Sequence, residues 1–351
     1  MKIKKIKIYP KIHQSFSNLE TSSFNHCDRD SWIIEIINTD NIKGYGEASP
    51  LPNFNNETYE ESGYALEGFK LALSGITNIE KEEIFILAKV HTINTPSACF
   101  AIETALYDLL AKENNLPMNL YLNSNASPKI SVNGIYNLSE VKKYNILKIK
   151  CGFRNLYNEI ELIESITDKY GKSTKLIIDL NESYDLVKAI RFFKEVAKYN
   201  IEYIEQPIKQ DNIEDLLELS FHTDIPIALD ETIKNIDSIE NLLKLNCGDI
   251  FIIKPQTFGS FSDINQAFKI IEAYEATFNN NPQEFEVKLS NKYFQFKTMP
   301  LFTSDGIIHS IVSVTENITE RIESQKMIEE NLNEKNVLLQ EIHHRVKNNL
   351  A

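Results

Sequence analysis

A series of short apolar segments, each followed by an amphipathic helical stretch, is the feature of this sequence that most constrains its fold. The apolar segments lie near 130–135, 146–150, 175–179, 202–205, 226–229 and 250–253. Helical periodicity fills the intervals between them, as in 158–170 and 185–198. The repeat of roughly 25 residues matches a βα unit with short loops. Six such units predict an α/β fold with a parallel sheet of the (β/α)8 barrel type.

The region before these units has a mixed pattern. Segment 32–37 is typical of a strand, whereas 57–80 and 97–113 carry helical periodicity. We therefore expect an α+β domain over 1–96. The helix that leads into the barrel and the βα units themselves would span 97–274.

The pattern changes again near residue 275. Three alternating segments follow without helices between them, at 284–289, 292–299 and 307–315. Ser304-Asp305-Gly306 is a hairpin turn signal. Antiparallel strands cannot continue a parallel barrel, so we expect a separate, partial antiparallel sheet over 275–318. A long polar helix with a narrow apolar stripe would occupy 319–351, as in a helical pair, and a dimer through this helix is one expectation.

Composition excludes several classes of protein. The net charge of −13 speaks against general affinity for nucleic acid or anionic membranes. No apolar run approaches the ~18 residues of a membrane span, and the charged start of the chain lacks the apolar core of a signal peptide. The 4 cysteines form no CxxC pair, so a zinc site or disulfide framework is not expected. We therefore expect a reduced, cytoplasmic setting.

Charged residues end the expected strands in a regular order. They are Lys148 and Lys150, then Asp179, Glu205, Asp230 followed by Glu231, and finally Lys254. Active sites of (β/α)8 barrels lie at the carboxyl ends of the strands. The sequence therefore predicts that three carboxylates from consecutive strands converge between lysines.

Three convergent carboxylates need a cation, and hard oxygen ligands suit Mg²⁺. Such an ion would stabilise the negative charge that develops on a substrate carboxylate as its α-proton leaves. A flanking lysine can take that proton if burial and a neighbouring ammonium lower its pKa. The alternative is that each acid only caps the helix that follows its strand. The serial order along the chain favours the metal site over capping alone.

The ordered set of strand-end residues resembles the enolase superfamily, in the branch with muconate cycloisomerases, dipeptide epimerases and o-succinylbenzoate synthases. The resemblance covers about 1–272. Gly44-Tyr45-Gly46-Glu47-Ala48-Ser49-Pro50-Leu51-Pro52 with Glu57-Thr58 looks like the capping-domain signature of o-succinylbenzoate synthases. Pro96-Ser97-Ala98 to Asp108 looks like the helix that leads into the family's barrel, and Lys254-Pro255-Gln256-Thr257-Phe258-Gly259-Ser260 resembles the synthases' Lys-Pro-x-x-x-Gly-Ser segment.

This resemblance implies a role for each matched residue. Metal ligands would be Asp179, Glu205 and Asp230. Lys150 would be the base, Lys254 would stabilise the enolate from the opposite side, and Lys148 would tune Lys150. Residues beside the metal or substrate would be Asn181, Glu231, Gly259 and Ser260, the last two through backbone N–H groups.

The implied substrate is a small carboxylate, and the implied reaction is dehydration of a cyclohexadiene carboxylate to o-succinylbenzoate in menaquinone synthesis. A carbon–oxygen lyase is thus the main expectation. Another superfamily activity, such as dipeptide epimerisation or muconate cycloisomerisation, is the alternative. The family's barrel needs two more strands after Lys254, which the pattern near 275 does not supply. We therefore expect an incomplete barrel of about six strands.

The end of the chain resembles a different protein class. Segments 284–288 and 313–321 resemble the last strands of a PAS domain and its exit motif. Segment 339–350 looks like a histidine-kinase phosphoacceptor box of the His-Arg-x-Lys-Asn type, with His344 as the acceptor. A solvated basic helix end is the plainer alternative. No glycine-rich phosphate loop follows, so we expect no autophosphorylation. A signalling fragment joined to a truncated enzyme is thus a further alternative for the function.

Overall fold

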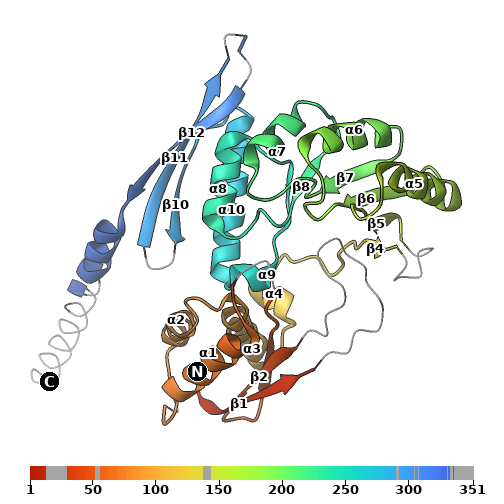
Figure 1. Ribbon diagram of the computed structural model, residues 1–351. Helices are drawn as coiled ribbons and strands as arrows, with labels where there is room; N and C mark the ends of the chain where they lie inside the picture. The colour runs from red at the N-terminus through yellow and green to blue at the C-terminus, as the bar shows by residue number, and fades with distance from the viewer. Residues whose placement is uncertain are drawn as a thin grey trace, which may run out of the picture. The chain divides into compact units, whose positions relative to one another are not determined.

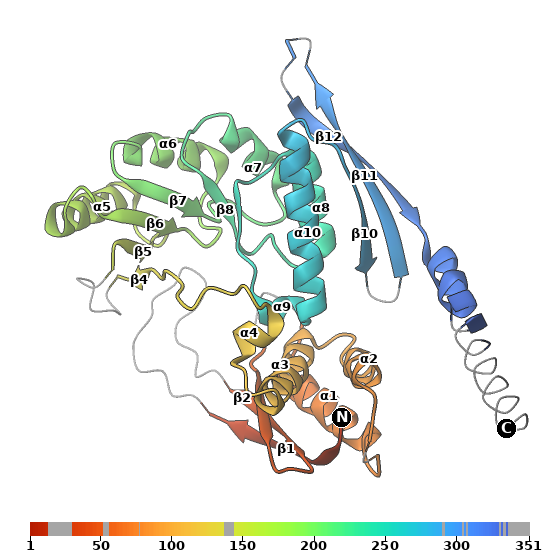
Figure 2. The same ribbon diagram turned by 180° about the vertical axis from the view of Figure 1, so that it is seen from behind.

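The computed structural model describes residues 1–12, 30–51, 56–76, 78–136, 144–289, 292–303, 305–306, 308–329, 331–332 and 335. The chain divides into two compact units, Met1–Ala267 and Phe268–Ala351. Figures 1 and 2 show the succession of elements from opposite sides.

The first unit begins with an antiparallel sheet in the order β1-β2-β3, covered by helices. Its strands are β1 (Ile3–Lys11), β2 (Ser31–Asn38) and β3 (Lys43–Ala48). The helices that follow are α1 (Tyr59–Ala72), α2 (Lys81–His91), α3 (Pro96–Glu113) and α4 (Met118–Leu122). Buried side chains of β2, α1 and α3 form one core, which includes Ile34, Ile36, Leu66, Phe69 and Leu106. The mixed α and β pattern expected for 1–96 is therefore present.

Two glycines of β3 allow the sheet to lie directly against the backbone of α3. A Cβ added at Gly46 would lie 1.9 Å from the carbonyl oxygen of Ala101, and one at Gly44 would lie 2.0 Å from that of Ala105. Neither position tolerates a side chain unless the strand and helix move apart. The Gly-x-Gly pattern in this part of the sequence thus has a packing reason.

Glu57 and Thr58 cap two different helices. The buried carboxylate of Glu57 accepts hydrogen bonds from the backbone N–H and the hydroxyl of Ser97, at 2.8 and 2.6 Å, and so satisfies the first turn of α3. Thr58 forms a capping box with Glu61 at the start of α1. This adjacent pair therefore fixes where both helices begin.

Six parallel strands form the second sheet of this unit, in the order β4-β5-β6-β7-β8-β9. They are β4 (Gly134–Ile135), β5 (Ile146–Lys150), β6 (Lys175–Asp179), β7 (Ile201–Glu205), β8 (Ile227–Leu229) and β9 (Ile250–Phe251). The intervening helices are α5 (Leu156–Tyr170), α6 (Leu186–Val196), α7 (Ile213–Ser220) and α8 (Ile236–Leu245). In Figure 1, α6 lies between α5 and α7 along the sheet.

Each of these helices is positioned by a cap and an apolar stripe. In α6 the side chain of Asp185 accepts a hydrogen bond of 2.8 Å from the backbone N–H of Lys188. Ala189, Phe192, Phe193 and Val196 are all buried on one face of the helix. Their spacing of three and four residues is the helical period, so burial against the sheet fixes the rotation of α6.

The last βα unit is tied to the first domain by polar contacts. Here α9 (Pro255–Phe258) precedes α10 (Phe261–Phe278). The side-chain oxygen of Gln256 accepts a hydrogen bond of 2.9 Å from the backbone N–H of Ser49. The buried carboxylate of Glu103, on α3, accepts one of 2.8 Å from the backbone N–H of Phe261 and so satisfies the start of α10.

The second unit contains the end of α10 and an antiparallel sheet in the order β10-β11-β12. Its strands are β10 (Gln283–Leu289), β11 (Lys292–Phe302) and β12 (Ile308–Asn317). Buried side chains come from the helix and from the strands, as with Tyr274, Val287, Phe296 and Ile311. Residues 319–329 are helical, whereas 336–351 lie outside the described residues.

The pattern of elements agrees closely with the sequence-based expectations. The parallel sheet of six strands and the antiparallel strands after residue 280 are confirmed within the described residues. The expected helix over 57–80 is shorter, because α1 ends at Ala72 and Gly75 has a φ of +82°, in the left-handed region. No described helix is both long enough and apolar enough to cross a membrane.

We predict that Gly46→Ala destabilises the protein by about 1–3 kcal/mol or more, because the methyl group collides with the α3 backbone. Chemical denaturation measures this loss. The matched control is Gly68→Ala, inside α1, where a Cβ meets only the His91 side chain, at 3.3 Å. Alanine favours a helix, so this control should keep or raise the stability. Equal effects of the two substitutions would contradict the packing role of Gly46.

A second prediction concerns the pH dependence of stability. Burial raises the pKa of Glu103 from 4.5 to about 7, although the bond from Phe261 acts in the opposite direction. Between these two values the folded state binds more protons than the unfolded state, so this group's contribution to stability falls as pH rises. Glu103→Gln should remove up to about 3 kcal/mol of that fall.

The measurement is the free energy of unfolding of both proteins at intervals from pH 4.5 to pH 7.5. The free energy of unfolding of Glu103→Gln, relative to that of the parent, should increase as pH rises. Glu164→Gln, at an exposed position of α5, is the control and should give a constant difference. Parallel profiles for Glu103→Gln and the parent would refute the assignment.

Candidate functional site

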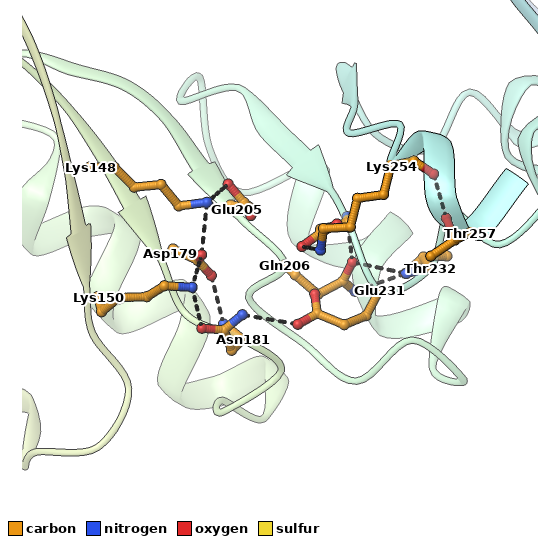
Figure 3. A network of polar contacts seen from close by, with 11 residues as sticks. Lys148, Lys150, Asp179, Asn181, Glu205, Gln206, Glu231, Thr232, Lys254 and Thr257 are labelled. Carbon is orange, nitrogen blue, oxygen red and sulfur yellow. Dashed lines mark hydrogen bonds and ion pairs between the residues drawn. The ribbon is translucent and has the colours of Figure 1, made fainter. Parts of the chain in front are cut away.

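The register of the parallel strands brings the predicted acids and lysines to one edge of the sheet. Lys150 of β5 lies opposite Asp179 of β6, and Asp179 lies opposite Glu205 of β7. Glu205 lies opposite Ala228, so Asp230 follows two residues later at the end of β8. Figure 3 shows the lysines of β5 pointing toward the acids of β6 and β7. The predicted acids and lysines therefore lie at the carboxyl ends of neighbouring strands.

The two lysines of β5 contact two of the acids. The ammonium of Lys148 donates to both carboxylate oxygens of Glu205, at 2.8 and 2.6 Å, and lies 2.9 Å from Oδ2 of Asp179. The ammonium of Lys150 donates to Oδ2 of Asp179 and, at 2.9 Å, to Oδ1 of Asn181. Lys148 therefore holds Asp179 and Glu205 close together.

A further ion pair lies at the next strand ends. Lys254, the residue before α9, donates from its ammonium to Oδ2 of Asp230 at 2.5 Å. Its side chain is 30% exposed, whereas that of Asp230 is 5% exposed. The ammonium of Lys254 is therefore partly accessible to solvent and is held in place by the buried carboxylate of Asp230. Three acids on successive strand ends thus lie between Lys148 and Lys150 on one side and Lys254 on the other.

Burial and charge shift the pKa values of these groups in opposite directions. Burial raises the pKa of Glu205 to about 7, assisted by the negative charge of Asp179 and opposed by Lys148. Burial acts to raise the pKa of Asp179, but Lys148 and Lys150 outweigh it and lower the pKa. For Lys148, burial is outweighed by Asp179 and Glu205, so its pKa lies above the usual value. The acids therefore depend on neighbouring cations to remain ionised.

Asn181 and Glu231 form a second layer behind these residues. The side-chain amide of Asn181 donates to Oε1 of Glu231 at 3.0 Å and accepts from Lys150 through its oxygen. Burial raises the pKa of Glu231 to about 7, with Asn181 opposing the shift. Asn181 thus connects the predicted base to a fourth, half-buried carboxyl group.

The donor set fits a hard divalent cation such as Mg²⁺. Oδ1 of Asp230 and Oε2 of Glu231 are buried without a hydrogen-bond partner, a costly arrangement for carboxylate oxygens. Asp179 and Glu205 already share one cation, the Lys148 ammonium. Within the described residues, however, no three acidic, histidine or cysteine side chains lie close enough together to hold a metal ion as they stand. Metal binding therefore requires the side chains to rearrange around Lys148 and Lys254.

Gln206 and Thr232 belong to the same network and were not expected from the sequence. Both are buried, and Figure 3 shows them between the ends of β7 and β8. The side-chain nitrogen of Gln206 donates to Oγ1 of Thr232 at 2.8 Å. The signal that could have found Gln206 is a glutamine directly after a strand-end acid and directly before Pro207, where a solvated turn residue would be usual.

The remaining predicted residues have local structural roles. The N–H of Gly259 donates to the carbonyl oxygen of Pro255 at 2.9 Å, within the turn of α9. The hydroxyl of Ser260 accepts from the N–H of Asp263 at 3.0 Å, in the first turn of α10. Their expected backbone contacts with a substrate stay a prediction. His344, the predicted phosphoacceptor, lies outside the described residues.

Comparison with a model of the family described as "Enolase C-terminal domain-like" gives a match over residues 137–291. This match extends beyond the boundary expected near 275 and into β10. It covers every strand end at which the acids and lysines gather.

Individual proteins are also similar to this chain. It is 28% identical to an L-Ala-D/L-Glu epimerase of Thermotoga maritima, over 70% of this chain and 72% of the relative. It is 25% identical to a chloromuconate cycloisomerase of Pseudomonas putida, over 72% of each. A dipeptide epimerase of Enterococcus faecalis, solved with Mg and the dipeptide L-Leu-L-Tyr, shares the fold with a TM-score of 0.70 and 24% identity, over 78% of this chain and 80% of that one.

These relatives favour the epimerase and cycloisomerase alternatives over the o-succinylbenzoate synthase that was the main expectation. None of them supports the lyase class, a PAS domain or a histidine kinase, so the assignments for 275–351 stay predictions. The family match and the relatives agree on an enolase-type protein, and the solved structure has the same fold. Residues 137–291, which contain β5 to β9, therefore match the family of enolase C-terminal domain-like proteins, and the relatives place the similarity in the enolase superfamily.

Proposed function

We propose that this protein catalyses Mg²⁺-dependent removal and return of the α-proton of a small carboxylate substrate, as an epimerase does. The observation that carries the proposal is the series of buried acids at consecutive strand ends, with Lys150 paired to the first of them and Lys254 to the last. The epimerase names of several relatives support this reaction type. A dipeptide is the substrate class that those names favour.

Two lysines on opposite sides of a substrate suit proton exchange at one carbon atom. Lys150 projects from β5, whereas Lys254 lies after β9 and is held by Asp230. One lysine in its neutral form removes the α-proton from one face. The other, as an ammonium, delivers a proton to the opposite face and inverts the configuration. Asn181 and Asp179 fix the position of the Lys150 nitrogen for this transfer.

Asp179, Glu205 and Asp230 would hold the metal. Sites of the enolase superfamily pair a Lys or His base with Mg²⁺, which stabilises the charge that develops on the substrate carboxylate. Lys148 contributes a further positive charge beside Asp179 and Glu205. That charge favours the ionised forms of both acids and so keeps them competent as ligands.

A second candidate is the dehydration to o-succinylbenzoate. Segment 254–260 favours it, because its sequence resembles that of the synthases and its residues adopt an ordered turn. In that turn the hydroxyl of Thr257 donates to the carbonyl oxygen of Lys254 at 2.8 Å. This reaction uses the same proton abstraction but then expels a hydroxyl group, so the two candidates differ in product and share the base.

Exchange of the α-proton with solvent tests the shared step. We predict that the protein with Mg²⁺ in D₂O incorporates one deuterium into an L-Ala-L-Glu-type dipeptide, seen as a mass increase of about 1 Da, and that Lys150→Ala lowers the rate by at least about 100-fold. The matched control is Lys175→Ala, an exposed lysine at the other end of the neighbouring strand. A panel with other dipeptides and the cyclohexadiene carboxylate separates the two candidates. No exchange with any member would refute the proposal.

The metal assignment has its own test. Asp179→Asn should weaken Mg²⁺ binding by about 100-fold or more, since even the partners of metal ligands typically contribute 10–100-fold. Isothermal titration calorimetry measures the affinity directly. Asp185→Asn is the control, because asparagine also caps a helix and Asp185 serves only α6 among the contacts described. Equal Mg²⁺ affinities for both variants would exclude Asp179 as a ligand.

A further inference from the structure

Gln206 occupies an unusual position directly after Glu205. Its side chain is fully buried, with 0% exposure, in the middle of the polar network in Figure 3. Its φ of +37° lies in the left-handed region, which a residue with a side chain rarely adopts. Such a conformation costs on the order of 1–3 kcal/mol and persists only where the surroundings enforce it. The cause of this strain therefore lies in the contacts that Gln206 makes.

The backbone of Gln206 connects the neighbouring strand ends. Its N–H donates to the carbonyl oxygen of Ala228, in β8, at 2.8 Å. Its carbonyl oxygen accepts from the N–H of Glu182, in the turn after β6, also at 2.8 Å. Gln206 thus lies at the junction of the three strand ends that carry the predicted metal ligands.

The side chain of Gln206 reaches past its own strand to the turn after β8. Its oxygen accepts from the backbone N–H groups of Asp230, at 2.9 Å, and Thr232, at 3.2 Å. Its nitrogen donates to the hydroxyl of Thr232 at 2.8 Å and to the carbonyl oxygen of Ile208 at 2.9 Å. The amide therefore uses both donors and its acceptor within the protein.

This saturation decides between two roles for Gln206. A residue that recognises a substrate needs an exposed donor or acceptor, and the Gln206 side chain has none to offer. The backbone of Asp230, by contrast, is held at two points: its N–H donates to the Gln206 oxygen, and its carbonyl oxygen accepts from the N–H of Ile233 at 2.9 Å. Of these two, the Gln206 amide is the contact that ties the backbone of Asp230 to the end of β7.

We infer that Gln206 is a positioning residue that sets the separation between Glu205 and Asp230, with Thr232 as its partner. The strained backbone turns the amide toward β8, and the amide then fixes the start of the turn that carries Asp230. The consequence is a preformed spacing of two predicted ligands. This inference rests on the proposed function, because it concerns the same Mg²⁺ site.

Mg²⁺ titration calorimetry of three proteins tests the inference, each with its thermal unfolding measured alongside. Gln206→Met keeps the length and burial of the side chain but removes its hydrogen bonds. It should weaken Mg²⁺ binding by about 10–100-fold, the usual effect of a residue that orients a ligand. Thr167→Val removes a buried hydroxyl from α5, which bonds the carbonyl oxygen of Ile163 at 2.9 Å. This control should lower the unfolding temperature and leave the Mg²⁺ affinity unchanged.

A second pair of variants keeps the test decisive if Gln206→Met does not fold. Thr232→Val removes the hydroxyl that the amide uses, whereas Thr232→Ser retains it. The valine variant should weaken Mg²⁺ binding by about 10-fold and the serine variant should restore the parent affinity. Failure of the parent protein to bind Mg²⁺ would overturn the proposed function and this inference with it. A parent that binds, with folded Gln206→Met or Thr232→Val within about twofold of it, would overturn the inference alone.

Discussion

The parallel register of β5, β6 and β7 is the constraint on which the site depends. It places Lys150 beside Asp179 and Asp179 beside Glu205, so residues far apart in sequence share one edge. A shift of one residue would turn every side chain of a strand to the opposite face. Leu176, Ile177 and Ile178 of β6 are buried in succession, so both faces of this strand are covered by the core. Packing thereby determines the chemistry at the strand ends.

Charge balance is the second condition that the site must meet. Asp179, Glu205 and Asp230 are at most 4% exposed, and isolated buried carboxylates are strongly unfavourable. The neighbouring lysines supply the positive charges that compensate these carboxylates. The same ammonium groups serve the proposed proton transfer, so stability and reactivity draw on one set of residues. Removing one partner of a buried ion pair leaves the other charge uncompensated, which is strongly destabilising. Substitutions of these acids and lysines should therefore affect folding and activity together.

The sequence predicts the strands and the acids well because both leave local signals. Short apolar runs mark β5 to β8, and a charged residue ends each run or closely follows it. For Gln206 the local signal, a glutamine between Glu205 and Pro207, does not reveal its role, since that depends on its partners Asp230 and Thr232, 24 and 26 positions away. Gly44 and Gly46 belonged to a recognisable motif, but their contact with α3 required the three-dimensional structure. The substrate leaves a weaker signal in the sequence, because proteins of one fold can carry different functions and differ in the residues around a shared site.

The two outermost strands of the parallel sheet, β4 and β9, contain 2 residues each. Within the described part of the chain, each pairs on only one side, so the sheet does not close on itself. An unpaired strand is a template onto which a foreign polypeptide can add, and its danger grows with its length. These short edge strands expose few consecutive unpaired backbone N–H and C=O groups. The open sheet thus presents little backbone for another strand to pair with at either edge.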